Sequence, residues 1–111
     1  MQDKLLITRK IKKTIDYIEK AIENYPHRYN SLKNKIMDTC YELLELSYQA
    51  NLTKDINFMK NIIVKIRMIE YYIKNSLDKK LINYTKFENI GNYLIEINKM
   101  VNIWVKSEKA K

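Results

Sequence analysis

Three basic side chains recur at intervals of seven residues in the second half of the sequence. Lys60, Arg67 and Lys74 have this spacing, and Tyr71 lies between the last two. Residues seven apart lie on one face of a helix, so the three cations would form a stripe. Cations interleaved with an aromatic ring suit phosphate contacts combined with base stacking. The stripe indicates nucleic-acid binding, and the alternative is a solvated lysine face of the kind common on helical bundles.

Residues that could support catalysis or bind a metal are scarce. The sequence has one His and one Cys, which excludes a histidine pair, a cysteine cluster and an internal disulfide. His27 follows the only proline, where a turn or capping role is favoured. Cys40 falls on an apolar helix face, which favours a buried structural thiol over a nucleophile. Gly91 is the only glycine, so no glycine loop can cradle a phosphate, and we expect it to allow close helix packing. We predict no enzyme, no metal and no cofactor.

Apolar residues recur every three or four positions along most of the chain, which predicts amphipathic helices. Ile11, Ile15, Ile18 and Ile22 show the pattern clearly. Pro26 then stops the first helix, because proline lacks an N–H and its ring clashes with the preceding turn. We predict helices over about residues 5–25, 31–51, 54–77 and 86–108.

Residues that cap helices support two of these starts. Thr53 is the expected N-cap of the third helix, with Asp55 suited to the positive end of its dipole. Thr85 and Glu88 have the spacing of a capping box at the start of the fourth. Four helices with short links predict one domain, residues 1–111, of the all-α class with an antiparallel up-down-up-down four-helix-bundle architecture.

The charge of the chain is consistent with a polyanionic partner. The net charge is +8 and the isoelectric point is near 9.5. Lys, Asn, Ile and Tyr make up about half of the chain, as an AT-rich genome would produce, so drift is the alternative explanation. The bundle would bring segments 1–13, 42–52, 53–60 and 99–111 to one pole, and together these carry +6. Drift does not predict that concentration of charge.

Targeting signals are not apparent in the sequence. The N-terminal residues have no apolar signal-peptide core, and no apolar run approaches the roughly 20 residues that span a bilayer. A single cysteine suits a reducing compartment. We expect a cytoplasmic protein without membrane contact.

Several short motifs resemble the accessory variability determinant (Avd) proteins, which accompany the reverse transcriptase of diversity-generating retroelements. The "KIRMI" segment matches the family pattern through Lys65 and Arg67, and Pro26 followed by Arg28 matches its first turn. The last helix matches at Phe87, Glu88, Glu96, Lys99, Met100, Val101, Trp104 and Val105. The resemblance covers about residues 11–106. This sequence departs from the family at Asn98 and at Asn102 and Ile103, where the family has glycines.

The resemblance implies a homopentamer of four-helix bundles with a basic surface and no catalysis. Such a protein would bind a reverse transcriptase and its template RNA or an RNA–DNA hybrid, and would support mutagenic reverse transcription. The residues expected to contact phosphate or polymerase are Arg28, Lys35, Lys60, Lys65, Arg67, Lys74, Lys99 and Lys106. Trp104 lies on the apolar stripe, which favours packing at the bundle end over base stacking.

A second bundle family shares the expected architecture. Its members are encoded in intervening sequences of bacterial 23S ribosomal RNA genes and usually carry an Asn-Ile-Ala-Glu-Gly segment in the second helix. The equivalent segment here, "TCYELLELSYQAN", lacks it. The alternative function is therefore a scaffold of that type, with protein-only or non-specific nucleic-acid interactions.

Overall fold

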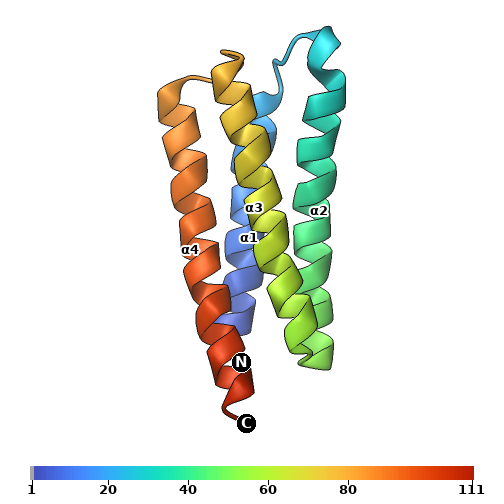
Figure 1. Cartoon of the computed structure of the whole chain (residues 1–111), viewed down its shortest axis with the longest axis vertical. Coiled ribbons are helices and arrows are strands. Elements are labelled where there is room, and N and C mark those ends of the chain that lie inside the picture. The colour runs from blue at the N-terminus through green and yellow to red at the C-terminus, as the bar shows by residue number, and fades with distance from the viewer. Residues whose placement is uncertain (1) are drawn as a thin grey trace.

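The chain folds into four long helices. A computed structural model describes residues 2–111, with side chains from residue 6 onward. Its elements are α1 (Gln2–Ile22), the 3-10 helix η1 (His27–Tyr29), α2 (Asn30–Thr53), α3 (Ile56–Asp78) and α4 (Tyr84–Lys109). No strand occurs among these described residues, so the all-α class with four helices is confirmed. In Figure 1 successive long helices run in opposite directions, and the two chain ends lie at the same end of the bundle.

An isoleucine-rich core holds the helices together. The stripe of α1 is buried, as its spacing predicts, and Ile36 of α2, Ile66 of α3 and Ile97 of α4 are at most 1% exposed. Burying an isoleucine side chain contributes about 1.5–3 kcal/mol, so this core is the main stabilising term. Each helix packs on two others: α1 on α2 and α4, and α3 on α2 and α4. The outer surface of the bundle therefore includes grooves between neighbouring helices.

The start of α3 differs from the expected one by two residues. Thr53 was expected to cap this helix, but it is the last residue of α2, and its hydroxyl donates to the carbonyl of Gln49 at 2.8 Å. Asp55 is the N-cap instead, and its carboxylate accepts a hydrogen bond from the Asn57 N–H at 2.8 Å. An aspartate also favours the positive helix end more strongly than a threonine, because it carries charge.

The start of α4 also corrects the sequence-based expectation. Asn83 is the N-cap, and its side chain accepts from the Lys86 N–H at 2.8 Å. Thr85 therefore lies inside the first turn, and the predicted capping box of Thr85 and Glu88 is wrong. Asparagine is as good an N-cap as threonine or better, so the helix begins after Asn83, which comes earlier in the chain than Thr85.

The first turn is wider than the position of the proline suggests. The structure ends α1 at Ile22, three residues before the predicted end. The Tyr25 N–H donates to the Ile22 carbonyl at 3.1 Å, and the residue before a proline is biased away from helical geometry. The Lys33 ammonium reaches back from α2 and donates to the carbonyl of Glu23 at 3.0 Å, which closes the turn.

Gly91 does not mark a close helix contact. A Cβ built at this position would have no atom within 4 Å outside its own helix turn, so the prediction of close packing within the chain is wrong. The residue lies beside a shallow apolar groove between α3 and α4.

Trp104, in contrast, packs at the bundle end as expected and is only 6% exposed. Over residues 2–111, no helix combines the length and the apolar character that crossing a bilayer requires.

Candidate nucleic-acid interface

The basic stripe of α3 is present on the surface. Lys60, Arg67 and Lys74 are exposed, and Tyr71 between them is 63% exposed. The first and last cations are 14 positions apart, which corresponds to about 21 Å of helix. The Tyr71 ring packs edge-on against Tyr72, with ring centroids 5.8 Å apart. The stripe thus presents three cations and a supported aromatic ring along one face of α3.

Two cations of this stripe already have acidic partners. The Arg67 guanidinium lies 3.4 Å from the Glu70 carboxylate, and the Lys74 ammonium lies 2.7 Å from that of Asp78. Sequence reasoning missed both pairs, although spacings of three and four residues on a helix are their usual signature. Exposed pairs of this kind contribute only about 0–1 kcal/mol, so a phosphate can replace the carboxylate at small cost.

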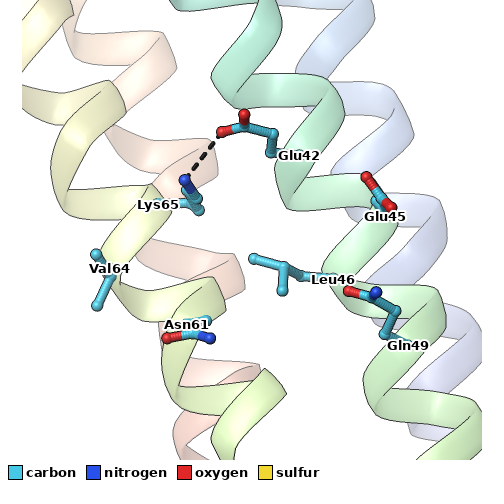
Figure 2. Close-up of a pocket in the computed structure, with 7 residues that line it drawn as sticks. All are labelled: Glu42, Glu45, Leu46, Gln49, Asn61, Val64 and Lys65. Carbon is cyan, nitrogen blue, oxygen red and sulfur yellow. Dashed lines mark ion pairs between the residues drawn. The ribbon is translucent and has the colours of Figure 1, made fainter.

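Lys65 lies apart from the stripe, in a groove between α2 and α3. Its ammonium is 2.9 Å from the Glu42 carboxylate, and Figure 2 shows the side chain reaching across from α3 to α2. The groove has a volume of about 360 Å³ and also includes Glu45, Gln49 and Asn61. Two carboxylates and one ammonium give it negative local charge, which disfavours a phosphate and suits a basic protein segment better.

The other predicted cations are distributed over the molecule. Arg28 lies in η1, with its guanidinium 5.1 Å from the centre of the Tyr29 ring, a distance typical of a cation–π contact. Lys35 is exposed on α2, and Lys99 and Lys106 are exposed on α4. The structure therefore brings together the three cations of the α3 stripe but not all eight predicted residues.

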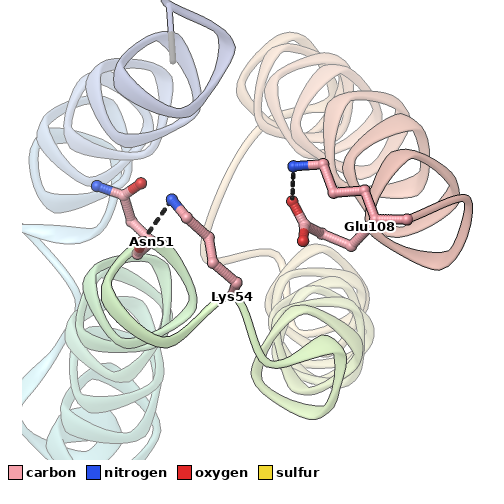
Figure 3. Close-up of polar contacts among 4 residues, drawn as sticks. Asn51, Lys54 and Glu108 are labelled. Atoms are coloured by element: carbon pink, nitrogen blue, oxygen red, sulfur yellow. Dashed lines mark hydrogen bonds and ion pairs between the residues drawn. The ribbon is translucent and has the colours of Figure 1, made fainter.

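The pole shared by the chain ends holds several basic residues in local contacts. Lys54 has a left-handed backbone, with φ of 60°, and its ammonium donates to the Asn51 carbonyl at 2.9 Å. Lys111 forms an ion pair with Glu108 at 3.2 Å. Figure 3 shows Lys54, directly after α2, and Glu108, near the end of α4, at this end of the bundle. Part of the positive charge predicted at this pole of the bundle therefore already caps a helix end or pairs with a carboxylate.

A second polar groove lies between α1 and α4, and sequence reasoning did not find it. It has a volume of about 350 Å³ and includes Lys10, Lys13, Tyr17, Asn89, Asn92 and Tyr93. The Tyr17 and Tyr93 rings are in contact, with centroids 5.4 Å apart. The only advance signal is the three- and four-residue spacing of these polar positions within each helix.

Comparison with protein families identifies the chain. The bAvd-like family matches residues 5–108, which is nearly its full length. The chain belongs to the bAvd-like family. This match confirms the resemblance that the motifs of the first turn, α3 and α4 indicated. Comparison with curated proteins gave no match.

The departures of this bAvd-like chain from the Avd pattern fall into two groups. Asn102 and Ile103 are both exposed, Ile103 to 65%, so the bundle's own packing does not depend on them. Asn98 is half-buried, and its side-chain oxygen has no hydrogen-bond partner among the described residues. Ile103 therefore adds an apolar side chain to the outer face of α4.

Cys40 has the environment of a structural residue. Its side chain is 1% exposed, and burial raises the pKa of the thiol to about 12. Desolvation disfavours the charged thiolate, which is the reactive form of cysteine. Among the described residues, no group of three His, Cys, Asp or Glu side chains is arranged to hold a metal ion.

Proposed function

We propose that this bAvd-like chain is a non-catalytic basic adaptor. It binds the reverse transcriptase of a diversity-generating retroelement together with the template RNA, and so supports mutagenic reverse transcription. Membership of the family, over residues 5–108, carries this proposal. The net charge of +8 and the exposed cations of the α3 stripe support the RNA part of it.

The proposal extends to architecture and setting. The chain would act as an antiparallel up-down-up-down bundle, assembled as a homopentamer in the cytoplasm without a cofactor. Exposed apolar side chains on the outer helix faces, including Leu52 at 84% and Ile103 at 65%, are consistent with burial between subunits. Light scattering after size exclusion in high salt tests the assembly. The expected mass is five times the 13.4 kDa of one chain, and a monomer or dimer would contradict the pentamer.

Binding of RNA is tested with a variant of the α3 stripe. Replacing Lys60 and Lys74 by Gln removes two exposed cations, so the affinity for single-stranded RNA should fall and its salt dependence should weaken. The matched control replaces Lys79 and Lys109 by Gln, which makes the same charge change at exposed positions outside the candidate set. Equal effects of the two variants would remove the stripe from the proposal.

The polymerase part needs a separate measurement. We expect a reverse-transcriptase gene beside this one, and its product should co-elute with the chain during size exclusion. The α2/α3 groove is the expected contact, because its carboxylates Glu42 and Glu45 suit a basic segment of the polymerase. Replacing both by Gln should weaken co-elution without weakening RNA binding. Absence of both RNA and polymerase binding at physiological salt would favour the protein-only scaffold.

A further inference from the structure

The α1/α4 groove combines the chemical groups that recognise a nucleotide. It is open to solvent and is formed by side chains of Lys10, Lys13 and Tyr17 from α1 and of Asn89, Asn92, Tyr93 and Glu96 from α4. Its volume of about 350 Å³ lies near the lower end of the roughly 300–1,000 Å³ typical of ligand sites. The groove thus suits a small planar group better than an extended cofactor.

The aromatic rings of this groove are held in place. Tyr17 and Tyr93 are both half-buried, and their planes meet at 42°. The Asn89 side-chain amide donates to the Tyr17 hydroxyl at 3.0 Å, a contact that links α1 to α4. The hydroxyl keeps its own hydrogen to donate to a ligand. A preorganised ring loses little entropy when a base stacks on it, which favours binding.

Charge in the groove is divided between its two lysines. Lys10 forms an ion pair with Glu96 at 3.2 Å, and its ammonium lies 6.0 Å from the centre of the Tyr93 ring. Lys13 is exposed and has no ion pair with any side chain that the structure describes. A phosphate could therefore bind Lys13 without displacing a carboxylate, whereas at Lys10 it would compete with Glu96. Asn92, which lines the same groove, offers amide groups of the kind that bind base edges in single strands.

Further exposed lysines lie on α1 and α4 on either side of the groove, in line with Lys10 and Lys13. Lys20 follows Tyr17 by one turn of α1, and Lys86 precedes Asn89 by one turn of α4; both are exposed. Lys99 lies one turn beyond Glu96 and is also exposed. Lys86 and Lys99 are 13 positions apart, which corresponds to about 20 Å of helix, enough for several nucleotides to lie along α4.

We propose that the α1/α4 groove docks a nucleotide of single-stranded RNA, with the base against the Tyr17–Tyr93 pair and the phosphate at Lys13. This inference rests on the proposed function, since it assigns the RNA to a second face of the bundle. An apolar protein segment fits the groove less well, because its walls carry hydroxyl, amide and ammonium groups and the Glu96 carboxylate, which is paired with Lys10. The α3/α4 groove is the apolar one, formed by residues such as Phe87, Leu94 and Ile95.

The test separates stacking from charge. A labelled single-stranded RNA of about 12 nucleotides, within the usual site size, is titrated by fluorescence anisotropy. Tyr93→Leu removes the ring and should weaken binding by about 5- to 150-fold, the range expected for one stacked base. Tyr93→Phe keeps the ring and should bind within about 2-fold of the wild type. Helical circular dichroism and melting curves identify any variant that fails to fold.

A charge reversal provides the second arm. Lys13→Glu should weaken binding at least 10-fold, whereas the exposed control Lys109→Glu should weaken it less than 3-fold, on the order expected for a change in net charge alone. Wild-type affinity in folded Tyr93→Leu, or equal losses for the two reversals, would overturn the groove as the site. If the wild type binds RNA and only the α3 stripe variant loses it, the proposed function stands and this inference fails. If the wild type binds no RNA at low salt, both fail.

Crosslinking adds a readout that does not depend on affinity. RNA carrying 4-thiouridine is irradiated with the wild-type chain, and the crosslinked peptides are mapped by mass spectrometry. Crosslinks should fall in residues 10–17 and 89–96, which form the two sides of the groove. Crosslinks confined to residues 60–74 of α3 would overturn the proposal.

Discussion

The acidic partners of the α3 stripe should restrain RNA binding, and their removal should increase it. Glu70 lies 3.4 Å from Arg67, and Asp78 lies 2.7 Å from Lys74. All four side chains are at least 37% exposed. A phosphate that binds either cation must displace its carboxylate. The double variant Glu70→Gln/Asp78→Asn removes both competitors and leaves the cations in place.

The size of this effect follows from the exposure of the pairs. Exposed ion pairs are worth about 0.2–1 kcal/mol each, so two of them oppose binding by about 0.4–2 kcal/mol. This corresponds to an increase in affinity of about 2- to 30-fold at low salt. If both cations then engage phosphates fully, the slope of log K against log salt should steepen by up to about 1.4 for a single strand.

A matched variant controls for net charge. Asp38→Asn/Glu19→Gln makes the same change in charge at exposed carboxylates that have no ion pair with a described side chain. Affinity is measured by fluorescence anisotropy with single-stranded RNA at several salt concentrations. Greater affinity for the stripe variant than for the control is expected. An unchanged affinity, or equal increases for the two variants, would refute the reasoning that the pairs compete with phosphate.

Three further predictions concern stability and reactivity. Gly91→Ala should raise the free energy of unfolding by up to about 1 kcal/mol, because the new Cβ meets no atom within 4 Å and alanine favours a helix; denaturant unfolding measures it, and a loss would show a hidden packing role. Asn83→Ala should cost about 1 kcal/mol as the loss of an N-cap, and Thr85→Ala clearly less; similar losses would contradict the assigned cap. Because burial raises the pKa of Cys40 to about 12, raising the pH from 7 to 9 should leave its thiol unreactive toward DTNB in the native protein, with full reaction in denaturant; rapid native labelling would show that the thiol is accessible.

The sequence was sufficient to predict the helices and their inner faces. Spacings of three and four residues identified the stripe of α1, and a spacing of seven identified the exposed cations of α3, because one helix fixes the direction of each side chain. The helix starts were less accurate at Thr53 and Thr85. In both places two or more residues of the right type compete within three positions, and the pattern of apolar residues does not decide between them.

The role of Gly91 could not be derived from its type. A lone glycine in a helix suggests a close neighbour, since it costs about 1 kcal/mol relative to alanine. Whether a neighbour exists depends on how α3 and α4 approach each other, and here the position opens into a groove. The sequence pattern fixes which face of α4 meets α3, but it does not fix the distance between them.

The α1/α4 groove shows most clearly why part of the candidate site was not predictable. Tyr17 and Asn89 are 72 residues apart in the chain, yet their side chains share a hydrogen bond of 3.0 Å. Periodicity places each on the outer flank of its own helix, but sliding one helix past the other by a turn would preserve both patterns. That register is set by the packing of the buried isoleucines and by the loop lengths. The same limit applied less to the α3 stripe, because all its members lie on one helix, and this is why the sequence indicated that surface and missed the groove.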